Sequence, residues 1–256
     1  MSASVRVGVA GWSLPRQHQH AFLTEGTHLE RYAARLPAVE INSSFYRPHR
    51  PATYERWASS VPRGFRFAVK LPRAVTHERR LVDVGAALDA FLGETAGLGT
   101  RLGCLLVQLP PSLAFDAAVV SRFLRVLRAR HDGDVALEPR HRSWFEAAPG
   151  ELLARHRVAR VAADPAVVPA AAEPAGWDEL VYLRLHGSPR MYYSAYDDAY
   201  LDALATRLAG FAAHARATWC MFDNTAHSHA TGNAVALRER LERGVAGRRR
   251  GRQARR

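Results

Sequence analysis

One residue type in this chain is rare enough to suggest a chemical role. Lysine and arginine together number 36 in 256 residues, and Lys70 is the only lysine. It lies near the end of an apolar run of β-strand type, residues 65–71. A lysine ammonium can lose its proton, whereas an arginine guanidinium stays charged in proteins. We therefore expect Lys70 to perform proton transfer or point-charge recognition that arginine cannot perform.

Other apolar runs also contain polar residues at their ends. Glu40, Gln108 and Arg184 each precede one more apolar residue, so they lie inside their runs. Buried ionisable groups need a partner or a hydrogen bond. We therefore expect the charged ones to pair with one another and with Lys70 and Glu138. The alternative is that Glu40 and Arg184 form an ion-pair lattice with a structural role alone.

Two run ends carry groups suited to acid–base catalysis. Glu138, Arg140 and His141 place a carboxylate, an anion-binding guanidinium and an imidazole within four residues. His186 follows another run directly and precedes Gly187, which permits close approach of a ligand.

The predicted chemistry is proton transfer to and from a small substrate. Lys70 would stabilise a developing negative charge or donate a proton, and Glu138 would act as general base with help from His186. The predicted catalytic residues are Lys70, Glu138, His186 and Asp223.

Binding groups are predicted at the ends of most runs. Arg140, Arg184 and the backbone at residues 224–225 could bind a carboxylate or phosphate. Three tyrosines in one loop, Tyr192, Tyr193 and Tyr196, could cover a ligand or belong to a packed surface loop. The predicted substrate-binding residues are Trp12, Glu40, Asn42, Ser43, Tyr46, Gln108, Arg140, His141, Arg184, Asn224 and Thr225.

Eight strand-type runs alternate with amphipathic stretches, which indicates strand–helix–strand units and a parallel sheet. The predicted strands are Val5–Val9, Ala38–Ile41, Arg66–Val69, Cys104–Gln108, Val135–Leu137, Ala159–Ala162, Val181–Leu185 and Trp219–Phe222. The predicted helices are His28–Leu36, Ala52–Ser59, Val82–Ala96, Ala117–Arg130, Glu151–His156, Ala199–His214 and Ala234–Arg243. Asp116 and Pro51 are typical residues at helix starts.

The pattern favours an α/β fold with a single closed (β/α)8 TIM-type barrel, in which the carboxyl ends of the strands form the active site. An open doubly wound sheet is the alternative, although no Gly-x-Gly-x-x-Gly follows the first run. Three prolines between Asp164 and Leu180 predict an irregular crossover after the sixth strand. We expect one domain over residues 1–246 and a disordered arginine-rich tail over residues 247–256.

Composition limits the setting in which the protein works. The net charge is +12, and six of the arginines lie in residues 247–256. This charge suits a small anionic ligand, or nucleic acid bound through the tail. We expect neither a secretory signal, because residues 1–9 lack its basic region and long apolar segment, nor a membrane span, because no run of about 18 apolar residues occurs. Cys104 and Cys220 lie in strand-type runs, as buried thiols do in a cytoplasmic protein.

Several functional alternatives stay open at this point. An enzyme of hydrolase, lyase or isomerase type is favoured, with no cofactor predicted. Lys70 could instead form a Schiff base, or a divalent metal could be held by Glu40, Glu138, His186 and Asp223. The protein could also be a nucleic-acid-binding protein without catalytic activity. In that case we expect Tyr46, Trp57 and Trp144 to be exposed aromatics that stack on bases. The histidines His18, His20 and His28 are predicted to lie in a solvated loop.

Six segments together resemble one known family. They are Val39–Tyr46, Phe65–Arg73 followed by Thr76–Glu78, Val107–Pro111, Arg140–Phe145, Leu183–Gly187 and Phe222–Thr225. With these strings the chain resembles the DUF72 (YecE-like) family over residues 5–243. The resemblance implies a TIM-type barrel and no particular reaction, because the family is named for its unknown function. Two histidines in the eighth loop, His227 and His229, depart from the family pattern and leave open a local metal or anion site.

Overall fold

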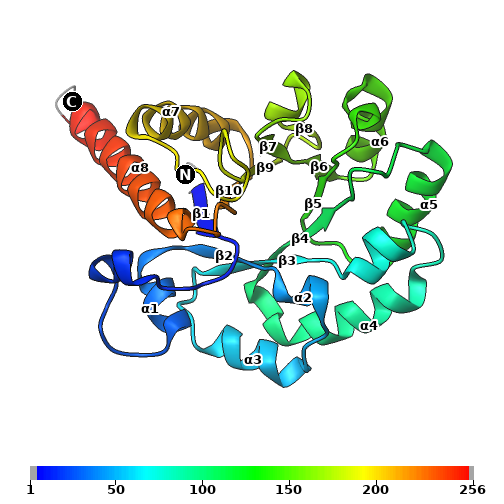
Figure 1. Ribbon diagram of the computed structural model, residues 1–256, viewed down its shortest axis with the longest axis horizontal. Helices are drawn as coiled ribbons and strands as arrows, with labels where there is room; N and C mark the ends of the chain where they lie inside the picture. Colours follow the sequence, from blue (N-terminus) through cyan, green and yellow to red (C-terminus); the bar gives the residue numbers. More distant parts are fainter. Residues whose placement is uncertain (1–4, 254–256) are drawn as a thin grey trace.

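The strands lie in two sheets in the part of the chain that the computed structural model describes, residues 5–253 with side chains through residue 244 (Figure 1). One sheet has the order β1 (Val5–Val9), β10 (Ala217–Phe222), β9 (Leu180–Leu185) and β7 (Ala162–Asp164). The other has the order β2 (Ala38–Ile41), β3 (Arg66–Lys70), β4 (Leu102–Gln108), β5 (Val135–Glu138), β6 (Val158–Arg160) and β8 (Ala175–Gly176). All neighbouring strands are parallel except β6 and β8, so the carboxyl ends of the parallel strands lie on one side.

The two sheets approach each other at two edges. Ala10, which follows β1, forms a parallel bridge with Glu40 of β2. β6 and β7 are one stretch of chain interrupted at Val161, whose N–H donates to the Leu137 carbonyl of β5 at 2.9 Å. The single strand predicted over Ala159–Ala162 is therefore divided, because its first part pairs with β5 and its second part with β9.

Helices follow the strands and surround the sheets in Figure 1. The α-helices are α1 (His28–Arg35), α2 (Ser43–Tyr46), α3 (Pro51–Ser59), α4 (Gly85–Thr95), α5 (Ala117–Arg128), α6 (Ala147–Arg155), α7 (Asp198–His214) and α8 (His229–Gln253). Shorter turns are η1 (Arg16–Ala21), η2 (Ala74–Glu78), η3 (Ala96–Arg101), η4 (Arg142–Phe145) and η5 (Pro169–Ala172), of which η2 is a π-helical turn. After β7 the chain forms η5 and β8, in line with the irregular crossover that the prolines predict.

The two faces of the strands contribute to different apolar clusters. A large cluster joins the strands to the helices, for example Phe67 to Leu88. A second cluster, the inner apolar layer, consists of Ala38, Ala68, Cys104, Leu106, Ala136, Ala159, Val161, Leu180, Tyr182, Ala217, Trp219 and Met221. Side chains alternate along a strand, so the residue two positions after a member of this layer faces the same way. The residues at the strand ends therefore form the next layer of side chains beyond it.

The start of α8 differs from its prediction. The helix begins at His229, earlier than the predicted start at Ala234. Gly232 lies in its first turns, and a Cβ at this glycine would lie 2.5 Å from the His18 ring. A side chain at this position would therefore require the His18 ring of η1 to shift, and Gly232 does not end the helix.

The far end of α8 enters the segment predicted as a tail. The helix runs to Gln253, whereas residues 254–256 and the side chains from residue 245 on lie outside the described residues. The disorder expected for residues 247–256 stays a prediction. None of the helices within residues 5–253 combines the length and apolar content that a bilayer span requires.

The N-terminal cap of α5 gives a stability test. The Asp116 carboxylate accepts hydrogen bonds from the N–H groups of Ala118 at 2.9 Å and Val119 at 3.0 Å. We expect Asp116→Ala to lower the free energy of unfolding by about 1 kcal/mol, the usual loss for a removed cap. Urea denaturation would measure it, with the exposed turn residue Asp178 as a control. An equal effect of Asp178→Ala would contradict the assignment of the loss to the cap.

Candidate active site

The guanidinium of Arg184, near the end of β9, is the centre of the candidate site. Its Nε and Nη2 donate to the two carboxylate oxygens of Glu40 at 3.0 and 2.6 Å, a bidentate pair. Its Nη1 donates to Glu138 at 2.6 Å, and Nη2 also donates to Asp223 at 2.9 Å. The Tyr182 hydroxyl donates to Glu40 at 3.0 Å. Arg184, Glu40 and Glu138 are buried, so these ions neutralise one another away from water.

His186 and Arg140 contact the second oxygen of Glu138. Arg140 Nη2 lies 2.7 Å from Glu138 Oε1 and 3.0 Å from His186 Nε2. His186 Nε2 lies 2.9 Å from Glu138 Oε1, and its Nδ1 lies 3.1 Å from Asp223 Oδ2. A neutral imidazole can donate to one of these carboxylates, whereas a protonated ring can donate to both. We call this group the charged cluster: Glu40, Glu138, Arg140, Arg184, His186 and Asp223.

Two carboxylates of the charged cluster, those of Glu138 and Asp223, are held ionised. Burial alone would raise the pKa of Glu138, but Arg184, Arg140 and His186 hold it well below its ordinary value. Burial likewise opposes ionisation of Asp223, and Arg184 and His186 lower its pKa. Both oxygens of Glu138 already accept hydrogen bonds from cationic groups or imidazole. Its contacts therefore favour a role in holding Arg140 and His186 over the predicted role of general base.

Lys70, at the end of β3, borders the charged cluster without forming an ion pair in it. Its Nζ lies 4.2 Å from the centre of the Phe45 ring, a cation–π contact. Among the residues whose side chains are described, no carboxylate oxygen lies within 4.0 Å of this amine. Burial, followed by repulsion from Arg184, lowers the pKa of Lys70 to about 8 despite nearby carboxylates. Lys70 therefore changes its charge close to neutral pH, where Glu138 and Asp223 stay ionised.

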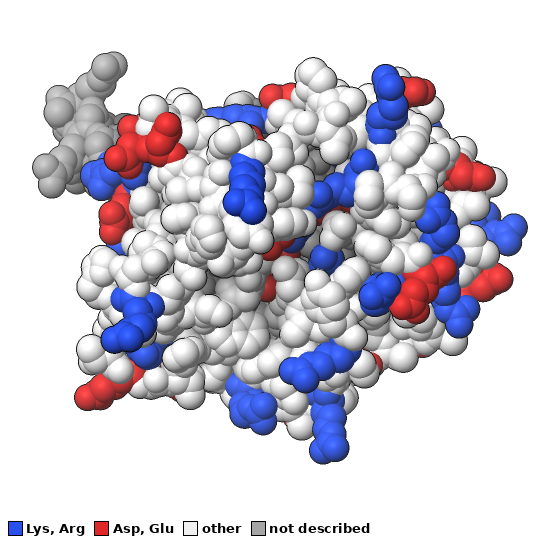
Figure 2. Space-filling view, viewed as in Figure 1, with Lys and Arg blue, Asp and Glu red and all other residues white. Residues whose placement is uncertain are grey.

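Part of the site faces solvent. Figure 2 shows a hollow in the middle of this view, with charged atoms of both signs inside it. Lys70 is 8% exposed, and the side chains of Arg140 and Asp223 are 12% and 13% exposed. Glu40, Glu138, Arg184 and His186 lie beneath them with at most 1% exposure. A ligand would therefore meet the amine, one guanidinium and one carboxylate first.

Some predicted binding residues make local contacts outside the charged cluster. His141 caps η4, with Nδ1 at 2.8 Å from Ser143 Oγ. Ser43 Oγ lies 2.8 Å from His49 Nε2. The Asn224 amide donates to the Ser194 carbonyl and to Asn233. These contacts hold loops in place, and the binding roles of these residues stay predictions. 

The remaining predicted binding residues are spread around the strand ends. Trp12 packs edge-on against Trp57 with ring centres 5.0 Å apart, and Gln108 donates to the neighbouring Leu109 carbonyl. Asn42 is half-buried, whereas Tyr46 and Thr225 are exposed. The described contacts place none of these side chains in the charged cluster.

The three tyrosines of the loop after β9 lie in different surroundings. The Tyr192 ring lies 5.7 Å from that of His186, so it approaches the charged cluster. Tyr196 is buried and accepts the Gly187 N–H while donating to Asp164, which makes it part of the loop's packing. Tyr193 stacks edge-on against His227 at 5.0 Å.

Three neighbours of the site were not singled out from the sequence. Tyr182 precedes Arg184 by two residues, so strand alternation was a signal that could have found it. Phe45 lies beneath Lys70, and His77 of the π-helical turn η2 packs edge-on against Phe45 at 4.9 Å. Single π-helical turns occur frequently at functional sites, but sequence spacing does not reveal them.

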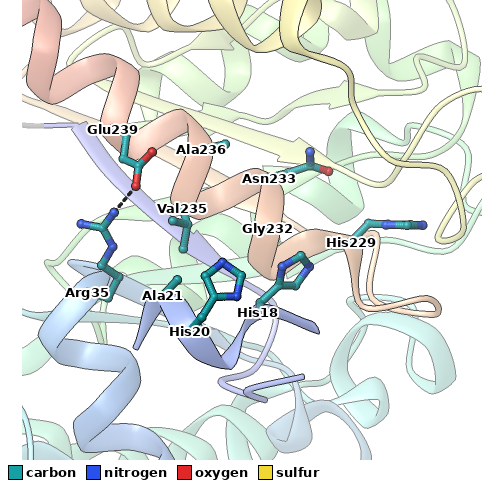
Figure 3. Close-up of a pocket in the computed structure, with 10 residues that line it drawn as sticks. All are labelled: His18, His20, Ala21, Arg35, His229, Gly232, Asn233, Val235, Ala236 and Glu239. Atoms are coloured by element: carbon teal, nitrogen blue, oxygen red, sulfur yellow. Dashed lines mark hydrogen bonds and ion pairs between the residues drawn. The ribbon is translucent and has the colours of Figure 1, made fainter. Parts of the chain in front are cut away.

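A second cavity lies away from the charged cluster, between η1 and α8 (Figure 3). Its volume is about 590 Å³, and its lining includes His18, His20 and His229, together with the Arg35–Glu239 ion pair. His18 and His20 line this cavity from the turn η1. His20 is exposed, as is His28 at the start of α1, in line with the predicted solvation, whereas His18 is half-buried. In the part of the chain with described side chains, no group of three or more His, Cys, Asp or Glu is arranged to hold a metal ion.

Comparisons with known proteins give the chain's relatives. A family model described as "Protein of unknown function DUF72" matches residues 6–255. UPF0759 protein YecE of Escherichia coli (strain K12) is 29% identical over 106 residues, which are 41% of this chain and 38% of that protein. The chain thus matches less than half the length of this relative.

Solved structures agree on the fold. A DUF72 family protein from Thermotoga maritima has a TM-score of 0.78 at 24% identity, covering 93% of this chain and 99% of that one. A xylose isomerase-like TIM barrel/4-hydroxyphenylpyruvate dioxygenase fusion protein has a TM-score of 0.50 at 14% identity, covering 96% of this chain and 45% of that one. At these identities the likeness concerns the fold alone, which is α/β and TIM-barrel-like.

Removal of the central guanidinium tests the electrostatics of the charged cluster. We expect Arg184→Met to lower the free energy of unfolding by about 3–5 kcal/mol near pH 7, because it leaves buried carboxylates without their main partner. The low pKa values of Glu138 and Asp223 stabilise the native protein above the ordinary carboxylate range, and this contribution disappears as the pH falls. The difference between the two proteins should therefore narrow towards acid pH.

Urea denaturation at several pH values would measure this effect. Arg216 is a matched control, because it pairs with Asp134 and Glu179 while its side chain is 51% exposed. Arg216→Met should change the free energy of unfolding by less than about 1 kcal/mol. A pH-independent loss in Arg184→Met would contradict the electrostatic explanation.

Proposed function

The chain belongs to the DUF72 family of proteins of unknown function, and we propose that it is an enzyme acting by acid–base chemistry on a small anionic or sugar-like substrate. The observation that carries this proposal is the unpaired amine of Lys70 beside the charged cluster. A buried lysine that served structure alone would be paired with a carboxylate. Among the described side chains, Lys70 contacts the Phe45 ring and no carboxylate within 4.0 Å, next to a partly open guanidinium and carboxylate.

The proposed roles follow from the contacts. Lys70 exchanges the proton, because it is the amine whose pKa lies close to neutral pH. Arg140 binds the substrate's carboxylate or phosphate: its Nε is buried and has no hydrogen-bond partner among the described residues, a state that a bound anion would relieve. Glu138 and His186 hold Arg140 in position, and Asp223, the most exposed carboxylate of the charged cluster, contacts the substrate.

The proposal includes a closed (β/α)8 barrel as the scaffold. Two observations support closure: the bridge between Ala10 and Glu40, and the change of partner at Val161 from β5 to β9. In barrels of this type the active site lies at the carboxyl ends of the strands. The charged cluster lies at those ends here.

The nucleic-acid alternative has less support among the described side chains. Trp144, expected as an exposed base-stacking residue, is buried and donates to the Leu113 carbonyl. Trp57 is half-buried and packs against Tyr54, whereas Tyr46 is 73% exposed. The expectation of exposed aromatics was therefore wrong for both tryptophans. The contribution of residues 247–256 and the cytoplasmic location stay predictions.

A titration of the single lysine tests the proposed function. Reductive methylation with isotope-labelled formaldehyde places one NMR-active group on Lys70 and another on the α-amine. The Lys70 signal is identified by its absence from the spectrum of Lys70→Arg. It should titrate with a midpoint near 8, instead of about 10.4 for an ordinary lysine. Inorganic phosphate should raise this midpoint, because a bound anion favours the charged ammonium.

A surface lysine provides the control for this titration. Arg155 is exposed, and Arg155→Lys adds a second lysine at the end of α6. Its signal should titrate in the ordinary range and stay unchanged with phosphate. A Lys70 signal that behaves in the same way would rule out the proposed anion-binding acid–base site.

A further inference from the structure

The surroundings of Lys70 are those of a nucleophilic amine. Arg184 and Arg140 already donate to the three carboxylates of the charged cluster, so the lysine is not needed as their hydrogen-bond partner. Its Nζ instead lies over the face of Phe45. An amine beside an apolar ring and a neighbouring cation is in the environment that activates lysines towards carbonyl compounds. Arginine, which supplies every other basic side chain apart from histidine, cannot react in this way.

We propose that Lys70 forms an imine with the carbonyl carbon of the substrate, and that the substrate is an aldehyde or ketone that also carries a carboxylate or phosphate. This inference rests on the proposed function, because it uses the same site and assigns the substrate's anion to Arg140. It adds a covalent step and narrows the substrate class to carbonyl compounds.

The step balances without an oxidant or reductant. The neutral amine attacks the carbonyl carbon and forms a C–N bond, while the nitrogen loses a proton and the carbonyl oxygen gains one. A second proton on that oxygen lets it leave as water, the C–O bond breaks, and the second N–H proton is released as the C=N bond forms. One amine and one carbonyl thus give one imine and one water.

The structure offers groups that can carry these protons. Asp223 is the most open carboxylate of the charged cluster, and its hydrogen bonds to Arg184 and His186 both use Oδ2. No described side chain donates to its Oδ1, so this ionised oxygen is available to accept a proton from the attacking nitrogen and pass it to the substrate oxygen. A lysine pKa of about 8 leaves an appreciable neutral fraction at neutral pH, which the attack requires.

Borohydride trapping tests the imine. The full-length protein would be incubated with pyruvate, glyoxylate or dihydroxyacetone phosphate, reduced with sodium borohydride and digested for peptide mass spectrometry. Borohydride delivers hydride to the imine carbon and leaves a stable secondary amine. We expect the adduct on the peptide containing Lys70 with at least one of these compounds, and complete loss of that adduct in Lys70→Arg.

Two variants sharpen the result. In Arg155→Lys the introduced surface lysine competes in the same tube, and it should carry at least tenfold less adduct than Lys70. Arg140→Gln should lower trapping of pyruvate more than trapping of acetone, because only pyruvate carries an anion. Unfolding curves would show that each variant is folded, and Lys70→Met replaces Lys70→Arg if the larger side chain prevents folding.

The outcomes separate this inference from the proposed function. No adduct on Lys70, or equal labelling of Lys70 and the introduced lysine, would overturn the imine. The phosphate-dependent titration of Lys70 could still succeed in that case, and the acid–base enzyme would stand without a covalent step. If Lys70 instead titrated as an ordinary lysine without a response to phosphate, while borohydride still trapped an adduct on it, the proposed anion site would be ruled out.

Discussion

Burial of Arg184 is the constraint on which the rest of the site depends. A guanidinium out of contact with water is tolerated only when its charge is balanced and its N–H groups have acceptors. Glu40 supplies a bidentate partner from β2, Glu138 supplies an oxygen from β5, and Asp223 supplies one just after β10. One side chain of β9 thus ties together strands from both sheets. Loss of any one of these partners would leave charge in a region from which water is excluded.

The charge balance of the cluster explains why one proton can move within it. Glu40, Glu138 and Asp223 carry three negative charges, whereas Arg184 and Arg140 carry two positive ones. Lys70 can supply the third positive charge, and the three carboxylates favour its charged form. Burial and repulsion from Arg184 oppose that charge and lower the pKa of Lys70 to about 8.

Strand alternation and the polar ends of the apolar runs predicted much of this arrangement. The predicted strand ranges overlap the observed strands, and strand ends brought Glu40, Lys70 and Arg184 to one place. The sequence could not show which carboxylate oxygens would accept hydrogen bonds. It therefore predicted Glu138 as a general base, although both of its oxygens contact Arg184, Arg140 or His186 in the structure. It could not separate His141 from the cluster either, because short polar side chains and imidazoles also bind nearby backbone groups and cap helices. Phe45 was missed because an aromatic residue next to Tyr46 gives no sign that a lysine lies over its face.

The inner apolar layer determines how strongly these charges act on one another. Small residues, Ala38, Ala68 and Ala136, precede the charged residues by two positions on β2, β3 and β5, and leave space on the inner face. Tyr182 and Trp219 occupy that space as a stacked pair with ring centres 5.8 Å apart. Because the residues of this layer are buried, they separate Arg184 from solvent on that side and keep the local dielectric low. The low dielectric strengthens the ion pairs, and the same desolvation lowers the pKa of Lys70. Packing in the interior and the low pKa of Lys70 at the opening are therefore consequences of one arrangement of small and large side chains.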